Sequence, residues 1–206
     1  MMQKDSLKST TRIWGYHSLL AVALLAAITP GFSQSNGKPA TIDATAQGTS
    51  TQLGSMVSVK VIINRFSTEE DRQQLIAAFK QGQSPGLVKA LSKMPSVGRI
   101  AITGTVGYDL AYIRLIKTPT GRKIRFATNR LIRFGEAYAN SQSMAYDLTA
   151  GEFDLNDADK DKSTGVLFPA SQLIINKKGE LQFELRKNPW KLTNIIDWDK
   201  AGSEAK

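Results

Sequence analysis

The sequence predicts an α+β fold, in which a two-helix hairpin is inserted after the first strand of a curled antiparallel sheet of about seven or eight strands. Two observations lead to this prediction. After residue 95, apolar residues mostly alternate with polar ones, which is the period of a half-buried strand. Between residues 67 and 94, apolar residues instead recur every three or four positions, as in a helix that packs by one face. Turn-forming residues separate these stretches.

The first predicted strand spans residues 57–63, where β-branched residues alternate with Ser58 and Lys60. A helix is expected directly after it, beginning at Ser67, which is spaced to form a capping box with Glu70. Gly82 is expected to end this helix. Its apolar face contains Leu75, Ile76 and Phe79.

A second helix is predicted from Ser84, an N-cap residue followed by Pro85 at the first helical position, to Met94 before Pro95. The two helices should form a hairpin that covers the dry face of the sheet. The residues expected to be buried by this packing are Leu75, Ile76, Phe79, Leu87, Leu91, Phe126, Phe183 and Leu185. The remaining predicted strands are 98–103, 108–117, 122–132, 144–155, 166–175, 180–187 and 191–196.

The hairpin around residues 118–121 carries an unusual set of charges. A tight turn there places Arg114 opposite Arg125 and Lys117 opposite Arg122, with apolar residues on the other face. Like charges opposite one another destabilise a sheet unless solvent, carboxylates or an anion offset them. Arginine suits phosphate or carboxylate, and Tyr112 on the same face could stack on a sugar. The candidate anion-binding residues are Tyr112, Arg114, Lys123 and Arg125.

The same charges have a simpler interpretation. Arg114 and Arg125 could lie on a solvated basic face, or pair with acidic residues from other strands. The sequence alone leaves this choice open.

Residues 1–33 have the features of a cleaved secretory signal. Lys4, Lys8 and Arg12 precede an apolar run at 19–28, and small residues near Ser33 offer a cleavage site. A helix of ten residues covers about 15 Å, roughly half of a membrane core of about 30 Å, so this run is too short to span it. Export to the periplasm or the exterior of a bacterium is therefore expected.

Three further segments complete the expected organisation. Residues 34–55 are rich in Ser, Thr, Gly and Gln and are expected to form a flexible tail. Residues 56–197 have the size of one α+β domain, and 198–206 form a polar C-terminal tail.

The amino-acid composition limits which catalytic and metal-binding sites the protein can form. The chain has no cysteine, and its one histidine, His17, lies within the signal. The mature chain would therefore lack thiol and imidazole groups, so we expect no metal site and no cofactor. Removing residues 1–33 takes away three basic residues and one acidic residue, which lowers the net charge from +9 to +7. Such a charge favours binding to anionic envelope components, namely lipopolysaccharide, phospholipid headgroups or acidic glycans. Nucleic acid is not an expected partner in that compartment.

Two other kinds of site were considered from the acidic residues. Asp157, Asp159 and Asp161 have the spacing that begins a calcium loop, but Lys162 and Phe168 replace its required glycine and glutamate. A pair of carboxylates could serve glycoside hydrolysis. The acids available for such a pair are Asp109, Glu136, Asp147, Glu152 and Asp154.

From about Met56 to Ile195 the chain resembles a family of exported bacterial proteins of unknown function. The resemblance rests on the segments 65–68, 107–110, 127–130 and Asn140-Ser141 before the strand at Met144. It implies export and a single domain, and it assigns no functional residue.

Together these observations predict a non-catalytic exported envelope protein that binds an anionic envelope component or a partner protein. The alternative is a carboxylate-based hydrolase that acts on an envelope polysaccharide.

Overall fold

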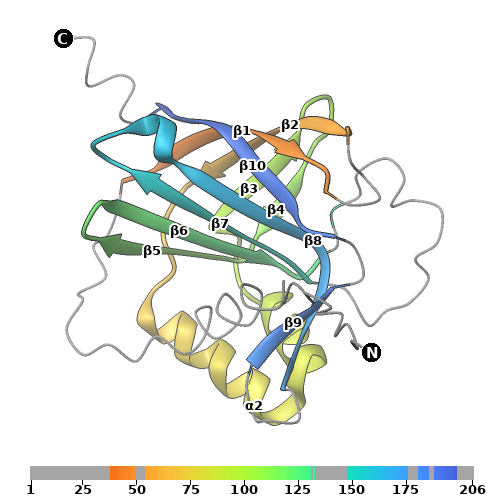
Figure 1. Cartoon of the computed structure of the whole chain (residues 1–206). Coiled ribbons are helices and arrows are strands. Elements are labelled where there is room, and N and C mark those ends of the chain that lie inside the picture. Colours follow the sequence, from red (N-terminus) through yellow and green to blue (C-terminus); the bar gives the residue numbers. More distant parts are fainter. Residues whose placement is uncertain are drawn as a thin grey trace, which may run out of the picture.

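The computed structural model describes residues 38–49, 54–130, 132, 148–175, 181–185 and 188–198, and for 175 and 181–185 the backbone alone. Within these residues, ten strands form one antiparallel sheet, and a single α-helix packs beside it (Figure 1). The α-helix is α2 (Glu69–Leu91), and a 3₁₀ turn, η4, spans Lys160–Lys162. The strands are β1 (Ala40–Gln47), β2 (Met56–Ile63), β3 (Gly98–Ile102), β4 (Tyr108–Leu110), β5 (Tyr112–Thr118), β6 (Gly121–Thr128), β7 (Leu148–Asn156), β8 (Thr164–Ile175), β9 (Leu181–Leu185) and β10 (Trp190–Asp197).

The sheet is curled until it is nearly barrel-shaped. Nine strands follow the order β4-β3-β2-β1-β10-β8-β7-β6-β5, and β9 pairs with the far end of β8. The strands at the two ends of this path, β4 and β5, are separated in the chain by Ala111 alone. The path must therefore return almost to its starting point.

Ser67 helps to close the seam between the two ends of the sheet. Its backbone N–H donates to the carbonyl of Ile113 at 2.7 Å, and its Oγ accepts from the N–H of Ile113 at 3.0 Å. These bonds satisfy backbone groups on the outer edge of β5, which would otherwise be an unpaired edge. Ser67 is therefore not the N-cap that the sequence predicted. Thr68 caps α2 instead, in a capping box with Asp71.

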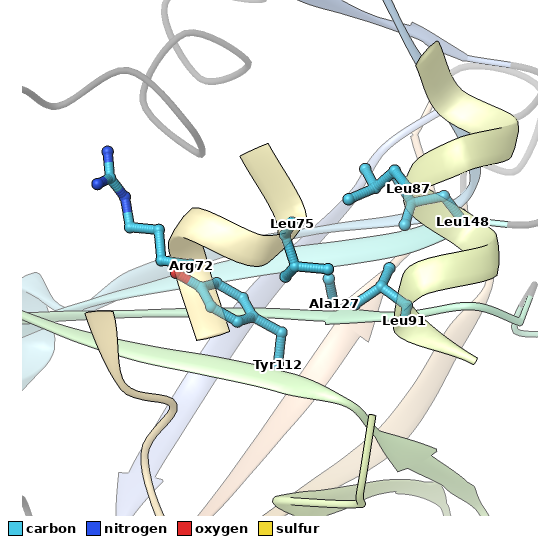
Figure 2. Close-up of a pocket in the computed structure, with 7 residues that line it drawn as sticks. All are labelled: Arg72, Leu75, Leu87, Leu91, Tyr112, Ala127 and Leu148. Atoms are coloured by element: carbon cyan, nitrogen blue, oxygen red, sulfur yellow. The ribbon is translucent and has the colours of Figure 1, made fainter. Parts of the chain in front are cut away.

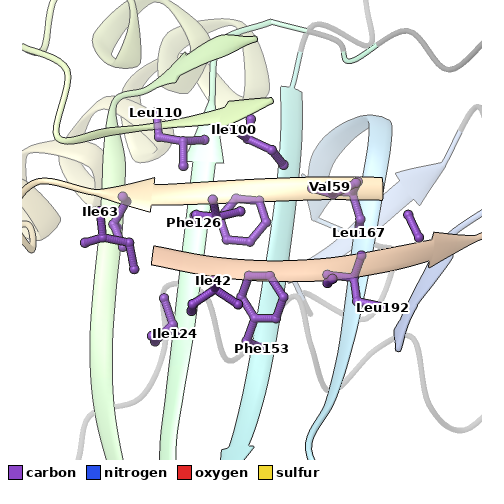
Figure 3. Packing of buried hydrophobic residues seen from close by; sticks show 14 of the residues in the cluster. Ile42, Val59, Ile63, Ile100, Leu110, Ile124, Phe126, Phe153, Leu167 and Leu192 are labelled. Carbon is purple, nitrogen blue, oxygen red and sulfur yellow. The ribbon is translucent and has the colours of Figure 1, made fainter. Parts of the chain in front are cut away.

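The interior of the curled sheet is filled by apolar side chains from every side (Figure 3). Phe126 and Phe153 lie at its centre, with ring centroids 5.8 Å apart. As predicted from the hairpin register, the alternating residues Ile113, Ile124 and Phe126 all point into this core. Removing this apolar surface from water is the main favourable contribution to folding.

A second core lies outside the sheet, under α2. Leu75, Phe79, Leu87 and Leu91 of the helix pack against the outer face of β5 to β8. The sheet residues of this cluster are Ala111, Tyr112, Ala127, Leu148, Ala150, Phe168 and Leu173. The helix therefore covers the face opposite to Phe126, so the expectation that both share one core is wrong. Side chains of Phe183 and Leu185 lie outside the described residues, and Ile76 is only half-buried.

The predicted two-helix hairpin is also wrong, although the α+β label fits. One helix, α2, runs from Glu69 to Leu91 with a kink at Gln83, whose φ is 52°. Ser84 does not act as an N-cap that starts a new helix; its buried Oγ accepts from the N–H of Leu173 on β8 at 3.1 Å. Gly82 and Pro85 therefore mark a bend, not the loop of a hairpin.

The insertion point and the strand count were wrong as well. The helix follows the second strand, because β1 lies within the segment 34–55 that was expected to be a flexible tail. β1 is paired on both sides, with β2 and β10, and buries Ala40, Ile42, Ala44 and Ala46. A second extra strand arises because the predicted strand 108–117 breaks at Ala111 into β4 and β5. The expected signal at 1–33 lies outside the described residues.

Candidate functional site: the outer face of β5, β6 and β7

The predicted register of the basic hairpin is confirmed. Arg114 lies opposite Arg125, and Lys117 lies opposite Arg122. Because side chains alternate along a strand, Tyr112, Arg114, Lys123 and Arg125 all face outward, on the side of the sheet that α2 partly covers. The structure therefore brings the four candidate residues to one surface. It also shows that they differ sharply in what surrounds them.

Arg125 and Lys123 are neutralised by acids on the next strand. Arg125 Nε donates to Glu152, which lies directly opposite it on β7. Lys123 Nζ lies 3.2 Å from Glu152 Oε1 and 2.8 Å from Asp154 Oδ2. Burial opposes the charge on Lys123, but the bonds to Asp154 and Glu152 outweigh it and raise the pKa of Lys123 above its usual value. For these two residues, pairing with acids from another strand is the correct interpretation.

The same pairing bears on the hydrolase alternative. Glu152 and Asp154 lie two residues apart on one face of β7, but both bind Lys123. Asp109 lies on β4 and pairs with Arg99 at 3.1 Å. Glu136 and Asp147 are outside the described residues. No observation in the described part of the chain therefore favours a carboxylate pair across a cleft.

Arg114 is in a different environment. Its side chain is half-buried, and neither Nε nor Nη1, both fully buried, has a hydrogen-bond partner among the described residues. Its charge acts on Glu69, in the first turn of α2. Burial would raise the pKa of Glu69, but bonds from Gln73 and Arg72 and the charges of Arg72 and Arg114 lower it. Arg114 thus has a carboxylate nearby, while two of its buried nitrogens bond to no described group.

Tyr112 is the second unsatisfied group. It is 3% exposed, and its buried hydroxyl has no hydrogen-bond partner in the described part of the structure. Burial raises the pKa of Tyr112 to about 12, although the positive charges of Arg114 and Arg72 act in the opposite direction. Figure 2 shows its hydroxyl directed at the N-terminal arm of α2, close to Arg72.

A small cavity adjoins the side chain of Tyr112. It lies between the two arms of α2 and the sheet, and its volume of about 10 Å³ holds about one water molecule (Figure 2). Its walls are almost wholly apolar. The residues that line it are Arg72, Leu75, Leu87, Leu91, Tyr112, Ala127 and Leu148.

Other charged groups near this hairpin form ion pairs that link strands or stabilise a turn. Arg122 binds Asp197 of β10 and lies 4.0 Å from Asp157. Asp159 caps the 3₁₀ turn η4 and pairs with Lys162 at 3.1 Å, so the aspartates at 157–161 form a hairpin tip. No cluster of three potential metal-ligating His, Cys, Asp or Glu residues occurs in the described ranges. Within the same ranges, no helix is both long and apolar enough to cross a membrane.

No protein-family model, curated protein or solved structure matches the chain. The resemblance to exported bacterial proteins thus stays a hypothesis. Sequence reasoning named Tyr112 and Arg114 but missed Glu69 and Arg72, the residues of α2 whose charges act on this site. Their only sequence signal was their position in the first turns of a helix, which does not show where that helix packs.

Proposed function

We propose that this protein is a non-catalytic, exported protein of the bacterial envelope that binds an anionic envelope component at Arg114 and Tyr112. One observation carries the proposal: the buried, unpartnered donor atoms of these two residues. Buried donors in native proteins almost always have an acceptor, and clustered exceptions suggest an ion or water that completes the site. An anion would supply acceptors for both side chains.

The positive charge of the protein and of the site favours an anionic ligand over a neutral hydrogen-bond acceptor. The expected mature net charge is +7, and Arg114 places a permanent positive charge within the site. Arg125 and Lys123 keep their own acids, so the binding residue of the opposed arginine pair is Arg114 alone.

Cosedimentation can test the proposal. The probes are vesicles that contain phosphatidylglycerol, lipopolysaccharide micelles and immobilised polygalacturonate. We expect binding to at least one probe, weakened by salt because exposed charge is screened within about 8 Å at physiological ionic strength. Binding should be lost in Arg114→Met. Lys117→Met is the matched control, because it removes the same charge from an exposed position on the same strand.

Equal binding of every anionic probe by wild type and Arg114→Met would overturn the assignment of the site. A protein partner in place of an anion would bind equally well at high salt. Export has its own test: mass spectrometry of the periplasmic or secreted fraction should find an N-terminus close to Gln34. An intact Met1 in the membrane fraction would contradict it.

A further inference from the structure

A hollow opens at the seam where the curled sheet does not close completely. β5 pairs with β6 as far as Tyr112, which lies opposite Ala127. If this register continued, Asp109 would lie opposite Arg130. Instead β4 pairs with β3, where Asp109 lies opposite Arg99, and β4 is not a neighbour of β6 in the sheet.

The hollow has a volume of about 430 Å³, within the range of roughly 300–1,000 Å³ that is typical of small-molecule sites. The residues that line it come from 107–111 at β4, from 129–130 after β6, and from 91–96 at the end of α2. It is more enclosed than the hollows of similar volume at the bend of α2 and between two hairpin tips. It is therefore large enough for a small ligand and is bounded by three separate segments.

Most of the residues that line the hollow are polar, and together they offer donors and acceptors. Asn129 is half-buried, and its amide, which can both donate and accept, forms no hydrogen bond within the described part of the chain. Asp109 uses Oδ1 for Arg99 at 3.1 Å, which leaves Oδ2 as an acceptor. Ser92 and Ser96 donate their hydroxyl hydrogens to backbone carbonyls, so towards a ligand they can only accept.

These groups favour a neutral ligand with several hydroxyls. The carboxylate of Asp109 would repel an anion in the hollow, and the guanidinium of Arg130 would repel a cation. A hydroxyl can accept from Asn129 or Arg130 and also donate to Asp109. An acyl chain would leave these polar groups unpaired. Met94 and Ala111 add apolar surface, which suits the carbon–hydrogen face of a sugar ring.

We infer that this hollow binds a neutral saccharide. Ring hydroxyls accept from the amide of Asn129 and the guanidinium of Arg130, and they donate to the carboxylate of Asp109. Neither Arg114 nor Tyr112 is among the residues that line the hollow, so this site is separate from the anion site of the proposed function and does not depend on it.

Isothermal titration calorimetry with oligosaccharides tests the inference. The neutral probes are maltotriose, cellotriose and triacetylchitotriose, and the charged comparisons are trigalacturonate and spermidine. We expect at least one neutral probe to bind, and more tightly than either charged one. The titrations use Arg114→Met as well as wild type, so that the anion site does not enter the comparison.

Two variants locate the site. Asn129→Ala should weaken saccharide binding about 5-fold or more, because it removes a donor and an acceptor. Ser92→Phe should weaken binding by filling the hollow from an exposed position. Asn64→Ala is the matched control, because it removes the same amide from an exposed position outside the hollow. Circular dichroism melting of each variant checks that its fold is intact.

Failure of every neutral probe to bind would overturn the inference and leave the anion site of the proposed function untouched. Saccharide binding that is equal in wild type, Asn129→Ala and Ser92→Phe would overturn this site. Tighter binding of either charged probe in Arg114→Met would show that the ligand is not neutral. Saccharide binding that persists in Arg114→Met, while the anionic probes are lost, would support two separate sites.

Discussion

Arg125 on β6 donates from Nε to Glu152, directly opposite on β7, and both side chains are buried on the outer face of the sheet. This pair explains how a strand can place Arg125 opposite Arg114 without a bound anion. The two arginines are not equivalent, because one has a buried acidic partner and the other has unsatisfied nitrogens.

Breaking the Arg125–Glu152 pair should destabilise the protein strongly. Glu152→Gln removes the carboxylate that pairs with the buried guanidinium of Arg125, and we expect a loss of about 3–5 kcal/mol in the free energy of unfolding. Urea unfolding measures it. The double variant Arg125→Met/Glu152→Met should lose much less, because no buried charge of the pair remains. Additive losses in the double variant would show that the two residues are not coupled.

Tyr112 should make the protein less stable at alkaline pH. Its pKa is about 12 in the folded state, against about 10 for an unfolded tyrosine. Between these values the unfolded chain has released a proton that the folded chain retains, so stability falls as pH rises from about 10 to about 12. The whole loss is about 3 kcal/mol at most.

The comparison with Tyr112→Phe isolates this effect, because the other tyrosines titrate in both proteins. Near neutral pH, Tyr112→Phe should be as stable as wild type or more so, since it removes a buried hydroxyl without a described partner. The advantage of Tyr112→Phe should then grow between about pH 9 and about pH 11.5 in urea unfolding. A constant difference between the two proteins would show that the hydroxyl is not protected from ionisation.

Phe79 should be essential for the packing of α2. It is 4% exposed in the cluster between the helix and the outer sheet face. Replacing Phe79 by Ala should cost about 3–5 kcal/mol in unfolding free energy, because it removes a large buried ring and leaves a cavity. The neighbouring exposed Lys80→Ala is the control and should change stability by less than about 0.5 kcal/mol. A loss below about 1 kcal/mol for Phe79→Ala would mean that the helix does not depend on this contact.

The segment expected to be a flexible tail should prove indispensable from residue 40 onward. A protein that lacks residues 1–37 retains β1 and should unfold cooperatively. Deleting residues 1–49 removes β1 from between β2 and β10 and exposes the edges of both strands, so that protein should aggregate or fail to fold. Circular dichroism melting and size-exclusion chromatography would check this. Cooperative folding of the shorter protein would contradict the central position of β1.

Local pattern was enough to predict much of the sheet. Alternation of β-branched residues located β2, and turn residues at 118–121 fixed the register that opposes Arg114 to Arg125. The sequence pattern did not predict β1, because its inward residues are mostly small. Ala40, Ala44 and Ala46 fill the space next to large neighbours but have a weak hydrophobic signal. The break between β4 and β5 at Ala111 was not predicted either, because it depends on where the sheet closes on itself.

The sequence by itself determined which residues alternate, where turns occur and which charges face one another across the hairpin, because these depend on neighbours along the chain. Only the tertiary structure decided which face of the sheet the helix covers and which charges are neutralised. Glu152 reaches Arg125 through the pairing of β6 with β7, and the electrostatic contact between Glu69 and Arg114 depends on the packing of α2 outside the sheet. These contacts join segments far apart in the chain, and no local pattern specifies them.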